Sequence, residues 1–447
     1  MNLIEKCRQM IGFDTSPGQS NRDLIGWARA LAESYGLSVQ TQESFLEDVP
    51  QQNIIIRPEA SRPDAEFLLQ THLDTVDPGP FQAWVHNQFN PFDATISEGR
   101  IYGIGAADAK LDFVCKLEAL AKYSGHSNWK LAPVLVGTFG EQAGMAGAMR
   151  LIRRNLVTPR FALVGEPTNL QLVYAAKGFA KVEIRIPFSE KEIQYRFEHN
   201  LKESTSTQSK IFLGKAAHSS NPDSGESAIM KMLEYLNQMP DNVAIMEIEG
   251  GTNFNSVPSN AFLEVDVHTV HDPIAIKIKK VYQLAKRLEE QFKAYQDKEF
   301  SPSYPTLNIG VIRTHEDHVL LLGNCRIPPL ITQAVYGNWM EGLKDECEKI
   351  GVRFQVSDYK RPFKTHEHSI FLKGGLDILR AMGLSDKGVT QPSTNESSLF
   401  ARLGADCLCF GPGIREENVH TPTENVRISD LETAIEFYRR MIERFSL

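Results

Sequence analysis

The 447-residue sequence predicts an α/β protein whose mainly parallel sheet is interrupted by a smaller, inserted α+β domain. Two observations predict it. Short apolar runs alternate with helical patterns up to about residue 175 and again after about 335, as is typical of a parallel sheet. Between these parts, strand and helix patterns follow one another without regular alternation. We therefore expect a first domain over 1–177 and 335–447, interrupted by a second over 178–334.

In the first domain, apolar residues three and four positions apart predict helices, and consecutive apolar residues predict strands. Helices are expected from Leu3 to Ile11 and from Leu24 to Ala32, where Gly36 ends the second one. Further helices are expected at 111–123, 147–156, 369–382 and 396–403 and from Asp430 onward. Strands are expected at 53–56, 67–70, 133–139, 161–165 and 405–410.

The second domain opens with a polar segment, 189–210, whose low apolar content predicts an insertion or a mobile hairpin. A helix is expected over 229–236 and a longer one over 274–292. Two alternating patterns, 244–251 and 261–270, predict strands with one buried face. This mixture indicates an α+β domain.

Composition narrows the class of protein. Hydrophobic residues make up 42% and charged residues 23%, which excludes a largely disordered chain. The net charge of −8, with no cluster of lysine and arginine, argues against nucleic-acid and membrane partners. No apolar run reaches the length of a membrane span, and the N-terminus lacks a signal-peptide pattern, so we expect a cytoplasmic protein.

The pattern of cysteines also fits a cytoplasmic protein. The six cysteines include no CxxC pair, which argues against both a disulfide scaffold and a structural zinc knot. Cys407 and Cys409 lie two positions apart in a predicted strand, so they share a face and are expected in the core.

Ligand sites in parallel sheets form beyond the carboxyl ends of the strands, so the residues there carry the functional prediction. His72 and Asp74 follow the run 67–70 and share one face of an extended chain. A carboxylate beside a histidine fixes the tautomer of a metal ligand, although a His and an Asp on a surface turn is the ordinary alternative. Asp108 follows a glycine-rich segment and comes just before a predicted helix. The alternative to a ligand role is an aspartate that only stabilises the N-terminus of this helix.

Three later strand ends add to this pattern. Glu141 and Gln142 stand between a predicted strand and a helix. Glu166 directly follows a nearly all-apolar strand, where a carboxylate is costly unless it is paired or bound to a metal. His420 follows the last predicted strand. Two histidines with Asp and Glu suit zinc, and such sites also accept cobalt or manganese.

The blocks that contain these residues resemble the M20 metallopeptidase family in order along the chain from about 65 to 430. They are THLDTVDPG, GIGAADAK, GEQAG, VGEPT, KAAHSSNPDSG, NSVP and VHTPTE. The resemblance implies a catalytic α/β domain with an inserted lid that often dimerises. A homodimer through the lid, 178–334, is therefore expected.

The same resemblance implies roles for the residues at the strand ends. His72 and Glu166 each bind one metal ion, and Asp108 bridges to a second site that His420 and position 142 complete. Asp74 orients His72. Glu141 is the general base.

Position 142 departs from the family pattern, which has two consecutive glutamates where this chain has Glu141 and Gln142. Glutamine offers a neutral carbonyl oxygen, so the second site loses one negative charge. Because His72, Asp108 and Glu166 are all present, we expect one tightly held ion and a second that is weak or absent.

The inserted domain carries the expected substrate-binding residues. His218 matches a lid histidine that stabilises the oxyanion, and Asn255 matches a residue near the substrate carboxylate. The family also has an arginine that binds this carboxylate, and its position corresponds either to Arg326 or to His268. We favour Arg326 because a guanidinium donates two hydrogen bonds to a carboxylate. In the first domain, the loop with Gly411 and Gly413 resembles one that lines the substrate pocket.

The expected activity is zinc-dependent hydrolysis of the amide bond of an N-acyl-amino acid, as in the acetylornithine deacetylase and succinyl-diaminopimelate desuccinylase branch of the family. One alternative is a dipeptidase or carboxypeptidase acting on a small peptide. The other is a non-catalytic binding protein whose site decayed at Gln142, against which the retained Glu141 argues.

Overall fold

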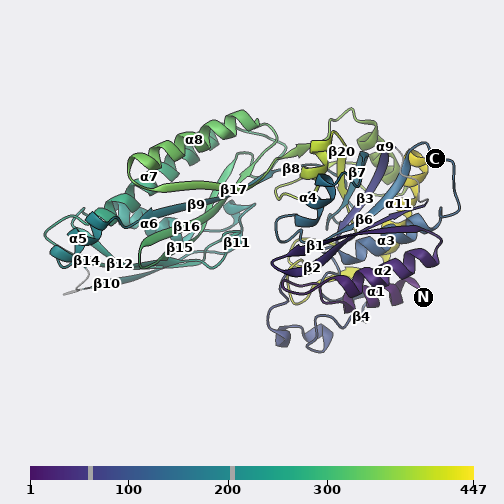
Figure 1. The fold of residues 1–447 in the computed structure, drawn as a ribbon, viewed down its shortest axis with the longest axis horizontal. Coiled ribbons are helices and arrows are strands. Elements are labelled where there is room, and N and C mark those ends of the chain that lie inside the picture. The colour runs from purple at the N-terminus through teal and green to yellow at the C-terminus, as the bar shows by residue number, and fades with distance from the viewer. Residues whose placement is uncertain (59–63, 202–206) are drawn as a thin grey trace. The chain divides into compact units, whose positions relative to one another are not determined.

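The computed structural model describes residues 1–58, 64–201 and 207–447, which divide into two compact units (Figure 1). Unit 1 comprises Met1–Ala175, Phe363–Thr390 and Asn395–Leu447. Unit 2 comprises Ala176–Pro362 and Gln391–Thr394, so it interrupts unit 1 along the chain. The predicted fold class, an α/β domain with a mainly parallel sheet and an inserted α+β domain, is confirmed.

Unit 1 is built on a nine-stranded sheet. Its strands, in spatial order, are β1 (Ser38–Leu46), β2 (Val49–Arg57), β6 (Ala132–Thr138), β3 (Glu66–His72), β7 (Pro159–Gly165), β20 (Asp406–Phe410), β8 (Val173–Ala176) and β18 (Phe363–Lys364), and β19 (Val389–Gln391) pairs with β8. The four central strands, β6, β3, β7 and β20, run parallel, whereas β1, β2 and β8 pair antiparallel with their neighbours. The carboxyl ends of the four parallel strands therefore meet at one edge of the sheet.

Both faces of this sheet are covered, which explains why its strands read as continuous apolar runs. Leu69 packs into the main core with the helices of one face, while its neighbour Leu68 is equally buried on the other side. The helices of the main core are α1 (Leu3–Gly12), α2 (Arg22–Ser34), α3 (Lys110–Ala121), α9 (Ile370–Ala381) and α11 (Ile428–Ser446). On the opposite face, α10 (Ser397–Phe400) begins where Ser397 contacts the sulfur of Cys409, and Ser398 contacts Met145 at the start of α4 (Ala146–Arg153). Cys407 and Cys409 are both buried there, as predicted.

Shorter elements complete unit 1. They are η1 (Phe81–Ala83), η2 (Val85–Asn87), η4 (Ala401–Leu403) and a small antiparallel sheet of β4 (Thr95–Ser97), β5 (Arg100–Tyr102) and β21 (Asn425–Arg427). Because β21 pairs with β5, the loop before β21 is held beside the chain that leads from β5 to α3. Two segments more than 300 residues apart are thereby brought together.

A buried polar network supports the strand ends of unit 1. Lys116 on α3 forms an ion pair with Asp112, 2.7 Å from Nζ to Oδ2, and also donates to the carbonyl oxygen of Gln70 on β3. Thr71 and Tyr438 donate to the two oxygens of the same Asp112 carboxylate. The network ties α3 and α11 to the last residues of β3.

This network leaves no room for a side chain at Gly165, the last residue of β7. A Cβ there would lie 2.0 Å from Oδ2 of Asp112 and 2.8 Å from Nζ of Lys116. We expect Gly165→Ala to lower the free energy of unfolding by about 3 kcal/mol, because it overpacks and disrupts a buried ion pair. Urea unfolding measures this. Gly26→Ala is the control, since its site in α2 is exposed with open space around the Cβ, and it should stabilise slightly; equal effects at both positions would contradict this account.

Unit 2 contains a seven-stranded antiparallel sheet. The spatial order is β10 (Gln208–Leu213), β14 (Asn260–Val267), β12 (Val243–Gly250), β15 (Thr306–Thr314), β16 (His318–Ile327), β9 (Gly178–Pro187) and β17 (Arg353–Lys360). A second, two-stranded sheet joins β11 (Ala217–His218) to β13 (Ser256–Val257), with η3 (Pro222–Ser224) nearby in sequence.

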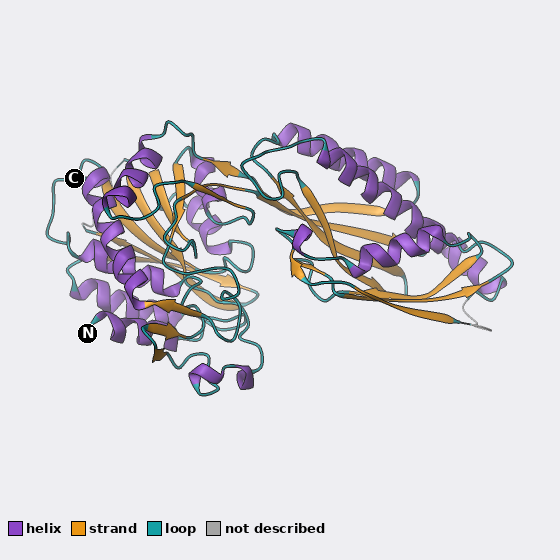
Figure 2. Cartoon of the chain, turned by 180° about the vertical axis from the view of Figure 1, so that it is seen from behind, coloured by secondary structure: helices purple, strands orange, loops and turns teal. Residues whose placement is uncertain are grey.

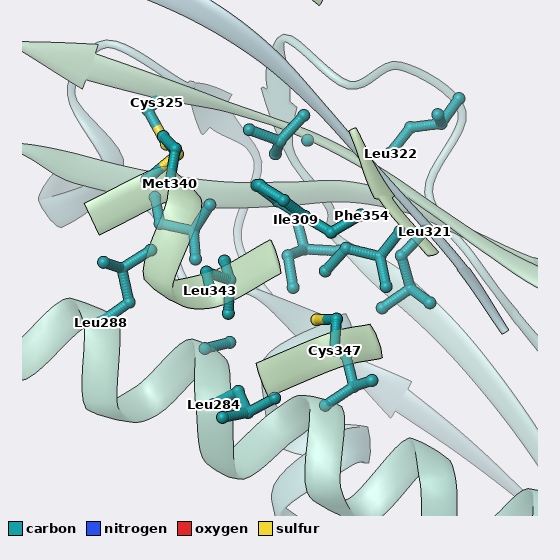
Figure 3. A pocket seen from close by; sticks show the side chains of 16 residues that line it. Leu284, Leu288, Ile309, Leu321, Leu322, Cys325, Met340, Leu343, Cys347 and Phe354 are labelled. Carbon is teal, nitrogen blue, oxygen red and sulfur yellow. The ribbon is translucent and has the colours of Figure 1, made fainter. Parts of the chain in front are cut away.

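Helices α7 (Pro273–Lys293) and α8 (Gln333–Lys349) lie along one face of the seven-stranded sheet (Figure 2). Together with α6 (Ala228–Gln238) they form the core of unit 2. Figure 3 shows side chains of α7, α8 and the sheet meeting around a small gap. The gap leaves only about 10 Å³ free, which is at most the space of one water molecule, so we interpret it as core packing.

The structure continues unit 2 beyond the predicted boundary at residue 334. Helix α8 and strand β17 belong to unit 2, which extends to Pro362. The reason is a non-local pairing: β17 adds to the sheet beside β9, more than 150 residues earlier.

The polar segment 189–210 also differs from its prediction. It contains α5 (Glu190–Glu198), which begins with a capping box between Ser189 and Glu192. Arg196 on α5 forms a buried ion pair with Asp272, 2.7 Å from Nη1 to Oδ2. Glu192 also pairs with Lys277, Leu201 is buried, and residues 208–210 pair with β14, so the segment is attached to unit 2 by charged contacts and strand pairing. Residues 202–206 of it lie outside the described residues.

Across the described ranges, no helix has the length and hydrophobicity to span a bilayer.

Candidate metal centre and substrate-binding residues

The parallel strands of unit 1 place the predicted ligands at one edge of the sheet. His72 is the last residue of β3, and Glu166 directly follows β7. Glu141 and Gln142 lie in the turn between β6 and α4. Strands β6, β3 and β7 are direct neighbours, so these side chains come close together although they are far apart in sequence.

Asp108 lies at the centre of the cluster. Nε2 of His72 is 3.2 Å from its Oδ1, and Nε2 of His420 is 3.1 Å from its Oδ2. Burial alone would raise the pKa of Asp108, but the hydrogen bonds from His420 and His72 outweigh it and hold the pKa well below its usual range. Two imidazoles from opposite ends of the chain thus converge on one ionised carboxylate.

Asp74 holds two parts of the centre. Nδ1 of His72 donates to the backbone oxygen of Asp74 at 3.1 Å and lies 3.6 Å from its carboxylate. The two carboxylate oxygens accept the backbone N–H groups of Glu141 and Gln142, each at 3.0 Å. Asp74 therefore fixes the orientation of His72, which leaves Nε2 directed at Asp108, and it also fixes the turn that carries Glu141.

Glu141 lies where burial and neighbouring charges shift its pKa. Burial raises its pKa well above the usual value, and the carboxylates of Glu166, Asp74 and Glu396 raise it further against the opposing effect of His72. A raised pKa brings a carboxylate closer to the pH at which it can take up and return a proton efficiently.

Gln142 reaches the same carboxylate as the two histidines. Its side-chain amide is 3.4 Å from Oδ2 of Asp108. If the amide is turned over, its carbonyl oxygen faces that position instead. Gln142 thus places a neutral amide beside Asp108.

Two residues of the centre were missed by the sequence-based prediction. Arg415 donates from Nη2 to Oε2 of Glu166 at 2.7 Å, and Glu166 is only 5% exposed. Glu424 accepts the backbone N–H groups of Ala107 and Asp108, at 2.9 and 3.0 Å, and thereby positions Asp108. Glu424 ends the block VHTPTE, so its position could have suggested a role; nothing in the sequence around Arg415 indicates its contact.

The two glycines of the loop after β20 lie against backbone of the same centre. A Cβ at Gly411 would be 2.4 Å from the carbonyl oxygen of Glu166, and one at Gly413 would be 2.5 Å from that of Ala107. Only glycine allows this close approach. The structure gives both a packing role, and their contact with substrate stays a prediction.

The donors fit a divalent transition metal, since two imidazoles and a carboxylate converge at one edge of the sheet. In the part of the chain that the structure describes, no three His, Cys, Asp or Glu side chains are already gathered as a metal shell. The ligand set is therefore a proposal.

A pocket adjoins the metal-ligand cluster within unit 1. It encloses about 240 Å³ and is lined on one side by Asp74 and Gln142 and on the other by the N-terminal loop around Thr15–Gly18 and by Glu47. Its size suits part of a small-molecule substrate.

The predicted substrate-binding residues of unit 2 form a second cluster. Nη2 of Arg326 lies 3.4 Å from Oδ1 of Asn255 and 3.4 Å from Oγ of Ser219, the neighbour of His218 in sequence. The guanidinium is also stacked over the ring of Phe179, 4.8 Å from its centroid. Nδ1 of His218 lies 2.7 Å from Oγ of Ser220.

The alternative residue, His268, lies elsewhere in unit 2. Its backbone N–H donates to Asn242 and its ring approaches Asp266. Arg326, and not His268, is the residue that lies beside Asn255.

A fold in which parallel strand ends gather His, Asp and Glu residues, interrupted by an antiparallel inserted domain, defines a class of metallohydrolases. The chain belongs to peptidase family M20/M25/M40, whose family model matches residues 68–444. It is a member of a family of metallopeptidases and amidohydrolases, as the sequence predicted.

Two relatives of known name are similar to this chain over nearly its whole length. The chain is 25% identical to an acetylornithine deacetylase of Myxococcus xanthus, covering 98% of this chain and 96% of the relative. It is 25% identical to an acetylornithine deacetylase of Proteus mirabilis, with coverage of 100% and 97%.

Solved structures share the fold over nearly the whole chain. An aminoacylhistidine dipeptidase from Vibrio alginolyticus superposes with a TM-score of 0.66 at 15% identity, covering 99% of this chain and 96% of that one. An M20 family metallo-carboxypeptidase from Sulfolobus solfataricus gives 0.63 at 18% identity, with coverage of 100% and 99%.

Proposed function

We propose that this protein hydrolyses the amide bond of N-acyl-amino acids with the help of a divalent metal ion, zinc or alternatively cobalt or manganese, bound in unit 1. The observation that carries this proposal is the convergence of His72 and His420 on Asp108 beside Glu141. The full-length similarity to acetylornithine deacetylases supports an acyl-amino acid as the substrate class.

The metal would be held by Asp108 with His72 and His420, with Glu166 and Gln142 as further ligands, and would polarise the amide carbonyl and acidify a water molecule. Glu141 takes the proton of the attacking water and passes it to the leaving nitrogen. Asp74 keeps both His72 and the Glu141 turn in position.

Residues of unit 2 are proposed to recognise the substrate. His218 stabilises the negative charge that develops on the carbonyl oxygen when water attacks the carbonyl carbon. Arg326, held beside Asn255, binds the free carboxylate of the amino-acid part through its planar guanidinium. The loop with Gly411 and Gly413 of unit 1 is proposed to line the substrate pocket.

The assembly is proposed to be a homodimer through unit 2. Strand β10 lies at an edge of the seven-stranded sheet, and its Ile211 and Leu213 are 68% and 71% exposed. An exposed apolar edge strand is a ready surface for pairing with a second copy. A cytoplasmic location is proposed as well, which the six free, buried cysteines support.

A substrate panel tests the proposed function. Metal-loaded protein is expected to release free amine from N-acetyl-amino acids, to lose this activity on dialysis against a chelator, and to regain it with zinc or cobalt. Cleavage of dipeptides alone would favour the dipeptidase or carboxypeptidase alternative. Metal-independent ligand binding without turnover of either class would favour the non-catalytic alternative.

A further inference from the structure

The contact between Arg415 and Glu166 bears on how many metal ions the centre holds. Glu166 is a predicted metal ligand, and one of its oxygens already accepts a guanidinium N–H at 2.7 Å. A metal ion bound to that oxygen at about 2.1 Å would lie within roughly 5 Å of the guanidinium nitrogen. Like charges at this distance repel each other, and the repulsion is strong where water is scarce.

The position of Arg415 is set by its loop. Asn418 is buried, donates to the backbone oxygens of Ile414 and Asn425, and accepts the N–H of Asn425. The backbone oxygen of Arg415 accepts the N–H of Val419 at 3.2 Å. The same short loop carries His420, so the guanidinium and the imidazole are presented to the cluster by one braced segment.

The charges around Arg415 identify what it neutralises. After the cost of burial, its pKa is raised by the carboxylates of Glu166, Asp108 and Glu141 together with that of its neighbour Glu416. Three of these four belong to the proposed metal centre. The centre therefore already contains one fixed positive charge, and at position 142 it lacks a negative one.

We propose that the Arg415 guanidinium takes the place of one of two metal ions, so that the centre binds a single divalent ion centred on Asp108. Gln142 removes a carboxylate from the second predicted site, and Arg415 places a permanent cation on Glu166, a ligand of the first predicted site. Both changes reduce the positive charge that the centre can still take up. This inference rests on the proposed function only in assuming that the cluster binds a metal.

Calorimetric titration of metal-free protein with Co²⁺ alone, and separately with Zn²⁺ alone, tests this. The unaltered protein should bind one ion tightly. Gln142→Glu should introduce weak binding of a second ion. In the double variant Gln142→Glu/Arg415→Met, the second ion should bind about ten- to a hundredfold more tightly than in Gln142→Glu.

Matched variants separate charge from shape. Gln142→Glu/Arg415→Lys keeps a cation and should behave like Gln142→Glu. Gln142→Glu/Arg380→Met should do so too, because Arg380 on α9 pairs with Asp386 at the surface of unit 1. Thermal melting checks folding, and Arg415→Gln replaces Arg415→Met if the latter is unfolded.

Two results would overturn the inference: two equally tight ions in the unaltered protein, or a second-ion affinity that is the same with and without Arg415. Because the readout is metal binding, either result leaves the proposed hydrolysis standing. Failure of every variant to bind any ion would contradict both.

Discussion

Replacing Glu141 by glutamine is expected to lower kcat for an N-acyl-amino acid by about 10²- to 10⁴-fold, which is the usual contribution of a general base. The amide keeps the size of the side chain but cannot accept the proton of the attacking water. Because the contacts that hold the turn come from the backbone N–H groups of Glu141 and Gln142 to Asp74, the architecture of the centre should persist. Steady-state kinetics together with metal analysis of the purified variant measure this.

A control is available on α11. Glu436→Gln alters a carboxylate that pairs with Arg440 at the surface of unit 1, and it should leave kcat unchanged. If Glu141→Gln retained most of the activity while its metal content equalled that of the unaltered protein, Glu141 would not be the base.

The second large effect is expected at Asp108. Asp108→Asn removes the one charge on which both histidines converge, so metal affinity should fall by more than about a hundredfold, and activity should be lost with it. The metal content after dialysis measures the loss. Asp377→Asn on α9, an exposed position, is the matched control. Normal metal content in Asp108→Asn would remove Asp108 from the ligand set.

How far the site could be predicted depends on which signal each residue leaves in the sequence. His72, Glu141 and Glu166 follow apolar runs, and such runs predict strands of a parallel sheet whose ends meet. These three residues can therefore be grouped from the predicted strands alone, without knowledge of contacts between distant loops. His420 could be added because it follows the predicted strand 405–410. In the structure this strand is β20, which pairs in parallel with β7.

Arg415 and the second domain boundary could not be predicted in this way. The contact of Arg415 depends on how the loop is braced by Asn418, and no periodic pattern reports on a loop conformation. The sequence predicts the boundary at 334 because the alternation of helix and strand patterns resumes after about 335. Only the pairing of β17 with β9, which is non-local, assigns α8 and β17 to unit 2.

The electrostatic state of the centre also lies beyond sequence patterns. The sequence shows that Gln142 removes a carboxylate, but the guanidinium that compensates Glu166 is 249 residues away along the chain. Glu166 is buried, and a buried carboxylate is unfavourable unless it is paired, which the contact with Arg415 provides.

One titration tests most directly the claim that unit 1 holds a metal ion that drives amide hydrolysis. Metal-free protein is titrated with Co²⁺ while the release of free amine from an N-acetyl-amino acid is followed. The account predicts no turnover without metal and a rate that rises to a plateau at about one ion per chain. A full rate in the metal-free protein, unchanged by added Co²⁺, would contradict it.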